Sequence, residues 1–336
     1  MRHSSRVGAE PTLFRYAAAT MLTPEQLGFF ETHGYLAVEG LLGRDVLEPV
    51  IVEYEGIMAE LRAGWIADGA LDQAAPAGSF EGQIIAAYRA GLDYFQPMDI
   101  SLPPGDITPD LPFHAGPAIF ALMTNDRLLD AVEQFIGPEI TSNPIQHVRI
   151  KPPSADLTAT EARAHITFTD WHQDRAVALP EADRTRMVTT WVAITDATVE
   201  NGCLRVIPGS HRGSMLPHCP KPQAAIADGY VDEAGARPVP VKAGGVIFFH
   251  PLTIHGSLAN TSPGVRWSFD LRYNAKEDPT GRPFFPGFVA RSRAHPETEL
   301  RDPAQWRAMW EAARARLAGG PPIKIHRWSA DAEHCA

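Results

Sequence analysis

Apolar residues recur at helical spacing in the first part of the chain. Val46, Val50, Tyr54, Ile57 and Leu61 fall three or four positions apart, which predicts an amphipathic helix. Further helices are predicted where a capping residue precedes such a pattern and a glycine or proline ends it. They occupy residues 24–32, 83–90, 126–136 and 303–318.

From residue 145 onward the pattern changes to short runs of β-type residues separated by Gly, Pro, Asn and Asp. The predicted strands occupy residues 145–151, 165–171, 187–194, 203–207, 245–249 and 265–273, after an earlier strand at 34–38. In the last run Arg266, Ser268 and Asp270 alternate with large apolar residues. This alternation predicts one polar face that lines a site and one apolar face that packs against helices.

These elements favour a fold that is mainly β, with flanking helices. At 336 residues the chain is compatible with one large domain, and no linker interrupts it. We expect a loose N-terminal segment at 1–20 and a single domain at 21–336. That domain comprises a helical part at 21–140, a β core at 141–275 and a C-terminal extension with a helix at 276–336.

Composition restricts the partners of the chain. The formal net charge of −10 provides no basic face for nucleic acid, and no apolar run is long enough to cross a membrane. We therefore expect neither nucleic acid nor membrane as a partner, and the sequence does not predict an oligomeric state. Three cysteines without a C-x-x-C pair indicate neither a disulfide framework nor a thiolate zinc site, which favours a reducing cytoplasm.

Two motifs carry candidate metal ligands. In FTDWHQDRAV, His172 and Asp174 are two residues apart, so an extended backbone projects both toward one cation. Alone, this pair is a weak signal, and a surface histidine beside a solvated aspartate would be the preferred interpretation. The second motif, FFHPLTIHGS, contains His250 and His255 and precedes Arg266. The spacing to Arg266 and the Gly-Ser that follows favour His255 as the ligand.

Two histidines and one carboxylate leave three positions open on an octahedral iron, as in non-haem Fe(II) oxygenases. Two positions can take a bidentate 2-oxo acid and the third can take dioxygen. An arginine on an adjacent strand then meets the far carboxylate of 2-oxoglutarate with a planar fork. Arg266 is the candidate for that role.

These motifs belong to a longer resemblance, which runs from Leu22 to about Tyr273. In order along the chain, the segments that carry it are LTPEQLGFFETHGYLAVEGLL, RIKPPS, WHQD, NGCLRVIPGSHRGS and FFHPLTIHGSLANTSPGVR. The chain resembles the phytanoyl-CoA dioxygenase family of iron(II)- and 2-oxoglutarate-dependent oxygenases. The resemblance implies a double-stranded β-helix, or jelly-roll, buttressed by helices.

The resemblance also implies roles for individual residues. The metal ligands that it implies are His172, Asp174 and His255, and the residues that it places around 2-oxoglutarate are Arg266, Ser257, Trp191 and Gln173. Lys151, in RIKPPS, and Arg175, directly after Asp174, are candidates to face an anionic substrate or co-substrate. A solvated or fold-stabilising cation is an equal interpretation of each.

The expected reaction uses Fe(II), 2-oxoglutarate and O2. It releases succinate and carbon dioxide, and it hydroxylates or otherwise oxidises a C–H bond of a small or medium organic substrate whose identity the sequence leaves open. Two other interpretations remain. One is a hydrolase that holds zinc at the same His/Asp/His site. The other is a jelly-roll binding protein without catalytic activity.

Overall fold

The computed structural model describes residues 12–15, 21–72, 78–156, 169–220, 224–325 and 327–335. Most of the segment predicted to be loose lies outside these ranges, and its described part includes strand β1 (Phe14–Arg15). The predicted strand at 165–171 is described only from residue 169, and there it is wrong. Residues 169–171 run as a loop into an isolated bridge between His172 and His255.

The N-terminal elements follow the local signals of the sequence. Helix α1 (Pro24–His33) begins with a capping box between Thr23 and Gln26, and it ends at Gly34, whose φ is 76°. Strand β2 (Tyr35–Glu39) follows directly, and α2 (Arg44–Ala67) is the long predicted amphipathic helix.

Three of the remaining helices were predicted and two were not. The predicted ones are α3 (Phe80–Arg89), α6 (Asp126–Ile136) and α7 (Pro303–Leu317). The additional ones are α4 (Phe95–Met98) and α5 (Pro117–Met123), which are short and lie in the proline-containing stretch before residue 125. A helix of one or two turns leaves too few positions for a periodic pattern to be recognised.

The strands form two main sheets within the described residues. The larger sheet has the order β1-β2-β9-β4-β11-β3-β12, and all its pairs except β1 with β2 are antiparallel. Its further strands are β3 (Glu139–Lys151), β4 (Met187–Ala193), β9 (Val246–Phe249), β11 (Arg266–Ala275) and β12 (Phe288–Ser292). The smaller sheet consists of β10 (His255–Ser257), β5 (Leu204–Val206) and β8 (Arg237–Val239), and a separate hairpin pairs β6 (His218–Pro220) with β7 (Ala224–Ile226).

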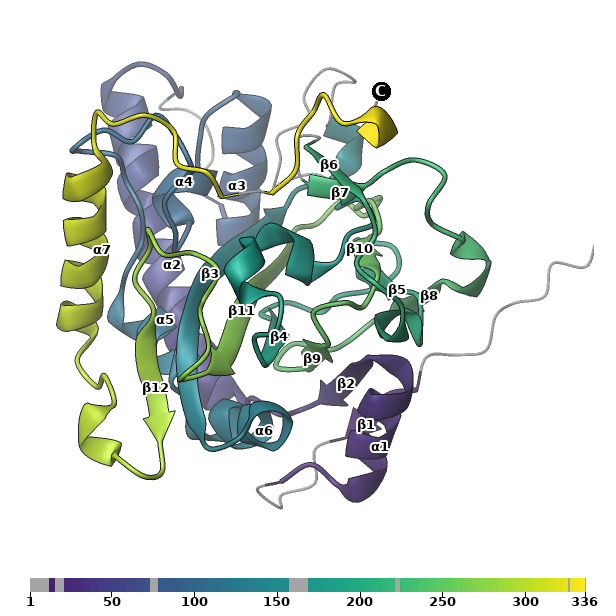
Figure 1. Ribbon diagram of the computed structural model, residues 1–336. Coiled ribbons are helices and arrows are strands. Elements are labelled where there is room, and N and C mark those ends of the chain that lie inside the picture. The colour runs from purple at the N-terminus through teal and green to yellow at the C-terminus, as the bar shows by residue number, and fades with distance from the viewer. Residues whose placement is uncertain are drawn as a thin grey trace, which may run out of the picture.

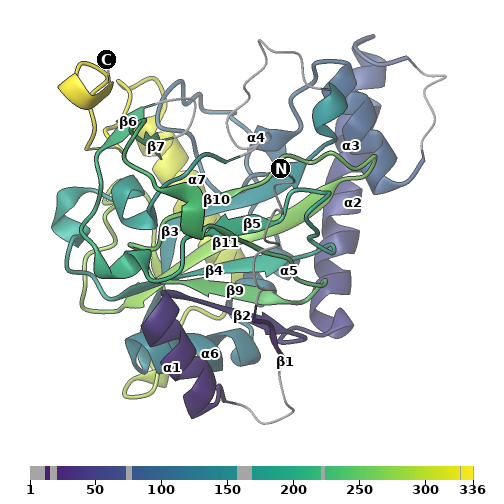
Figure 2. The same cartoon turned by 90° about the vertical axis from the view of Figure 1, so that its right-hand side faces the viewer.

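The two faces of the large sheet have different partners. Figure 1 shows α2, α5 and α7 on one face and the smaller sheet on the other, and Figure 2 shows the same layers from the side. Trp267, Phe269 and Tyr273 of β11 pack into the core beneath the helices. Trp191 and Phe249 belong to a second core between the sheets. The predicted jelly-roll with an apolar outer face on β11 is confirmed.

One prediction about the cysteines is wrong. Cys219 on β6 and Cys335 near the C-terminus form a disulfide, whereas Cys203 is free and buried. The two partners are 116 residues apart, so their spacing gave no indication that the fold brings the C-terminal segment to the β6–β7 hairpin. Among the described residues, no helix is long and apolar enough to cross a membrane.

Candidate active site

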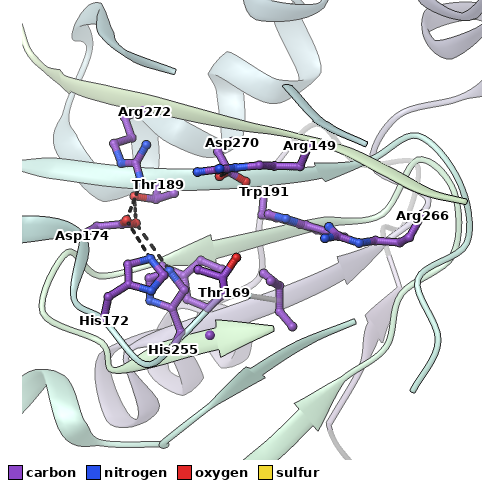
Figure 3. A pocket seen from close by; sticks show the side chains of 13 residues that line it. Arg149, Thr169, His172, Asp174, Thr189, Trp191, His255, Arg266, Asp270 and Arg272 are labelled. Atoms are coloured by element: carbon purple, nitrogen blue, oxygen red, sulfur yellow. Dashed lines mark hydrogen bonds and ion pairs between the residues drawn. The ribbon is translucent and has the colours of Figure 1, made fainter. Parts of the chain in front are cut away.

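Three side chains from the two motifs converge at one point between the sheets. His172 and Asp174 come from the loop that leads into a short 3-10 helix (Asp174–Val177), and His255 is the first residue of β10. Backbone hydrogen bonds of 2.9 and 3.0 Å join His172 to His255 in both directions, which fixes the two imidazoles side by side. Figure 3 shows the three side chains pointing toward one another.

Both imidazoles have their metal-binding nitrogen free. Nδ1 of His172 lies 2.9 Å from the carbonyl of Asp170, and Nδ1 of His255 lies 2.9 Å from the carbonyl of Thr253. A carbonyl only accepts, so each Nδ1 carries a proton, which leaves Nε2 as the atom that can bind a metal. Burial and the neighbouring His255 lower the pKa of His172 to about 3, so His172 is neutral, the form that binds a metal.

The carboxylate of Asp174 is held from two sides. Thr189 on β4 donates to Oδ2 over 2.5 Å, and Arg272 on β11 donates to Oδ1. Asp174 is fully buried, and burial alone would raise the pKa of its carboxyl. The charge of Arg272 and the two histidines outweigh burial and hold that pKa well below its ordinary range. The group is therefore ionised, as a metal ligand must be.

The donor set fits a divalent transition metal. Nε2 of His172 lies 3.7 Å from Oδ1 of Asp174, Nε2 of His255 lies 3.9 Å from Oδ2, and the three ligand atoms lie within 4.8 Å of one another. These two nitrogen–oxygen distances end on different oxygens of Asp174, and both are short enough for the three side chains to share one ion. Two imidazoles and one carboxylate are the ligand types that iron(II) oxygenases use.

Arg266 lies in the same cavity as the three ligands, at the first position of β11. Only 3% of its surface is exposed, its Nη1 donates to Ser268 over 2.8 Å, and its Nε has no hydrogen-bond partner. Its guanidinium lies 5.2 Å from the centre of the Trp191 ring, as Figure 3 illustrates. Trp191 thus lines the cavity, as the resemblance implied.

Lys151 is a second buried cation beside Arg266. The two residues are direct partners across β3 and β11, and Lys151 is 2% exposed. Burial, together with the charge of Arg266, holds the pKa of Lys151 well below its ordinary value. Neither cation has a carboxylate partner within the described part of the chain. Two buried cations without a countercharge are costly, and a bound anion would relieve that cost.

Ser257 is positioned to donate to the same anion. Its hydroxyl oxygen accepts one hydrogen bond from Nζ of Lys151 over 2.7 Å and another from the backbone N–H of Thr169 over 2.8 Å. A serine hydroxyl has two acceptor sites and one hydrogen, so the hydrogen remains available. The enclosed volume here is about 30 Å3, room for a single water, so side chains must move apart to admit a diacid.

Four predicted site residues are not among the residues that line this cavity: Ser257, Lys151, Gln173 and Arg175. The buried amide of Gln173 bonds to the backbone of Ser214, Leu216 and Leu252. The guanidinium of Arg175 bonds to the carbonyls of Ala182 and Thr185. The hydrogen bonds of Gln173 and Arg175 hold the loops on either side of Asp174.

The sequence analysis missed the residues that surround the ligands. Thr189, Arg149 and Arg272 line the same cavity, and Arg149 forms an ion pair of 2.7 Å with Asp270. The alternation along β11 indicated that Arg272 and Asp270 face inward, but nothing local indicated their contacts. A larger cavity of about 490 Å3 adjoins the site and shares His172, Arg149 and Arg272 with it.

The C-terminal segment forms part of the wall of this larger cavity. Ile325 is part of its lining. Arg327 donates to the carbonyl of Ala178, and the indole of Trp328 donates to the carbonyl of Ala176 over 3.2 Å and stacks on His218. Through these bonds the C-terminal segment holds the stretch that follows Asp174.

Comparison with known proteins places the chain in a family. The model of the family "Phytanoyl-CoA dioxygenase (PhyH)" matches residues 30–268. The peroxisomal phytanoyl-CoA dioxygenase of Homo sapiens is 26% identical over 277 residues, which cover 80% of this chain and 73% of that protein. The ectoine dioxygenase of Bordetella parapertussis is 27% identical over 183 residues, which cover 50% of this chain and 56% of that protein.

Solved structures share the fold. The apo form of ThoJ, a non-haem monooxygenase, has a TM-score of 0.52 at 20% identity and covers 86% of this chain and 97% of its own. The apo form of EctD from S. alaskensis has a TM-score of 0.51 at 20% identity and covers 88% of this chain and 93% of its own. The chain belongs to the phytanoyl-CoA dioxygenase family and is an iron(II)- and 2-oxoglutarate-dependent oxygenase.

Proposed function

We propose that the protein oxidises a C–H bond of a small or medium organic substrate, with hydroxylation as the expected outcome. Iron(II) would be held by His172, Asp174 and His255, and 2-oxoglutarate would bind between this site and Arg266. Succinate and carbon dioxide are the co-products.

The single observation that carries this proposal is the pairing of two features in one cavity. One end has two imidazoles and an ionised carboxylate. The other end has Arg266, which forms no ion pair with a carboxylate among the described residues and is the strand partner of the buried Lys151. A zinc hydrolase would need the first feature but gives no reason for the second. A keto-diacid that chelates iron at one end needs an anion site at the other.

Each residue of the site has its own role in this proposal. The three ligands supply one face of the metal, and bound iron provides the means to activate dioxygen. Asp170 and Thr253 fix the imidazole tautomers through their carbonyls. Arg266 gives two parallel N–H donors to the far carboxylate, Ser257 gives a third, and Lys151 fixes that serine. Trp191 packs against the guanidinium of Arg266 and restricts where the co-substrate lies.

The test separates binding from turnover. Under anaerobic conditions the protein is titrated with Fe(II) and then with 2-oxoglutarate, and the visible absorption of the iron chelate is followed. Oxygen is then admitted and succinate is measured. We expect stoichiometric binding and oxygen-dependent succinate release. Hydrolysis without oxygen would support the zinc hydrolase, and failure to bind iron and 2-oxoglutarate would support a non-catalytic binding protein.

We also propose that residues 21–336 fold as one oxygenase domain. A single apolar core includes Leu22, Tyr54 and Phe269 as well as Trp306 and Ala313, so it draws on the helical part, the sheet and α7. A helical part that folds alone would need its own core. Limited proteolysis should therefore release no stable fragment that begins or ends near residue 140.

A cytoplasmic location is part of the proposal and depends on the cysteines. A reducing cytoplasm keeps thiols reduced, so Cys219 and Cys335 would be thiols there. Alkylation of protein quenched directly from cells tests this. Three reactive thiols would support the cytoplasm. Reaction at Cys203 alone would place the protein in an oxidising compartment.

A further inference from the structure

A cavity of about 490 Å3 lies beside the metal ligands, and the proposed binding of 2-oxoglutarate does not use it. Its volume lies in the range of roughly 300–1,000 Å3 in which small molecules bind. Its walls are mostly apolar and come from α4, the chain after it, β3, and the C-terminal segment. Representative wall residues are Phe95, Leu102, Pro144, Ile145, Phe285 and Ile325.

Arg282 is a buried guanidinium in the wall of this cavity. It is 6% exposed, and its Nε and Nη2 both donate to the carbonyl of Val177, over 3.2 and 2.6 Å. Across the described ranges it makes no ion pair with a carboxylate. Burial and the neighbouring Arg272 lower its pKa to about 9, so the guanidinium still carries its charge at neutral pH. A buried charge of this kind is expensive unless a ligand pairs with it.

The acidic residues of the cavity do not neutralise Arg282. Burial raises the pKa of Asp99 to about 8, and its carboxyl already accepts from the N–H of Val148 over 3.0 Å and contacts His147 over 2.8 Å. Asp93 is exposed at the rim, where it caps α4 through the N–H of Phe95. Neither group provides the charge that a buried guanidinium requires.

The other two arginines of the cavity each form an ion pair with a carboxylate. Arg149 is paired with Asp270. Arg272 is paired with Asp174, the carboxylate that a metal ion would take as its ligand. Once a dication binds there, the attraction between Arg272 and Asp174 is shared with the metal, and the inner end of the cavity has an excess of positive charge.

We propose that the oxidised substrate is a carboxylic acid with an apolar body, and that its carboxylate binds Arg282 beside Arg272 while its body lies along the apolar walls. This inference rests on the proposed function and specifies its substrate class. A planar guanidinium pairs well with a carboxylate, and such charged hydrogen bonds are stronger than neutral ones.

The test compares acids with their neutral counterparts. Straight-chain and phenyl-substituted alkanoic acids, each beside its primary amide, are titrated by calorimetry into the anaerobic Fe(II)–2-oxoglutarate protein. The same pairs are tested by thermal shift on metal-free protein. We expect acids to bind about tenfold or more tightly than their amides. Binding of iron and 2-oxoglutarate is measured first on the same sample, so failure of the proposed function is seen separately.

Substitutions at Arg282 test whether this residue causes the preference for acids over amides. Arg282→Gln should reduce the acid-to-amide ratio to about one, and Arg282→Lys should restore part of it. Arg307→Gln, on the exposed side of α7, is the matched control and should keep the wild-type ratio. The ratio is measured within one sample, so it does not depend on the folded fraction. Equal binding of acids and amides, no binding of any acid, or an unchanged ratio in Arg282→Gln would each overturn the proposal.

Discussion

Replacing Arg266 by lysine tests the proposed co-substrate anchor while keeping the charge. Arg266 is buried, its Nη1 donates to Ser268, and its Nε has no hydrogen-bond partner among the described residues. A guanidinium presents two parallel N–H groups to a carboxylate, whereas an ammonium is a point charge with freely rotating donors. The substitution therefore removes geometry rather than charge.

The size of the effect follows from the hydrogen bonds that are lost. A hydrogen bond to a charged group contributes roughly 1.5–3 kcal/mol, so loss of one of two weakens 2-oxoglutarate binding about 10- to 150-fold. Lysine also loses the packing of the guanidinium against Trp191, which lies 5.2 Å away. Arg266→Gln loses the charge as well and should weaken binding further.

The measurement is an anaerobic titration of 2-oxoglutarate into the Fe(II) protein, for wild type, Arg266→Lys and the exposed control Arg307→Lys. Iron affinity should be unchanged in all three, because Arg266 contacts none of the three ligands. Turnover at saturating 2-oxoglutarate should recover most of the wild-type rate. If the lysine variant binds 2-oxoglutarate as the wild type does, Arg266 is not the anchor.

The remaining predictions concern the ligands, a buried acid and the C-terminal segment. His172→Ala should weaken iron binding by more than about 100-fold while the free energy of unfolding changes by less than about 1 kcal/mol, because the imidazole lines a cavity; full succinate release by the variant would contradict this. In the folded protein the pKa of Asp99 is about 8, which is above its pKa in the unfolded chain. As the pH rises from about 4 to about 8, the free energy of unfolding of the wild type should therefore fall by up to about 1.4 kcal/mol per pH unit. In urea titrations Asp99→Asn should lack this loss, and parallel curves for the two proteins would refute it. Trp328→Ala removes the bond to Ala176 and should lower iron affinity about fivefold, roughly 1 kcal/mol, in a competitive chelator titration; an unchanged affinity would mean that the C-terminal segment does not hold the loop after Asp174.

Local sequence patterns were sufficient to predict most elements of the fold. The cap at Thr23 and the glycine at residue 34 define α1, and the alternation in β11 separates Trp267 from Arg266 onto opposite faces. The one- and two-turn helices α4 and α5 were missed because they are too short for periodicity. The strand predicted at 165–171 is wrong over residues 169–171, which run as a loop into the bridge between His172 and His255.

The candidate site was predictable only where its residues lie in compact motifs. His172, Asp174 and His255 are brought together as expected. Gln173 was implied by the resemblance, and its amide bonds to loop backbone. The bonds of Arg175 to the carbonyls of Ala182 and Thr185 agree with the interpretation of Arg175 as a fold-stabilising cation. Arg272, Arg282 and the Cys219–Cys335 disulfide depend on contacts between distant segments, which no local pattern encodes.

The charged side chains on the inner face of β11 follow one another along the strand. Arg266, Ser268, Asp270 and Arg272 project from this face, and the first and last are about 20 Å apart along an extended strand. Asp270 lies between them and is paired with Arg149, so the middle of the face carries no free positive charge. An anion is therefore attracted more strongly to either end than to the centre. Because Arg266 attracts at one end and Arg272 with Arg282 at the other, two different anions can occupy the cavity system without competing. A co-substrate diacid and a substrate acid need that separation if both are to approach one metal ion.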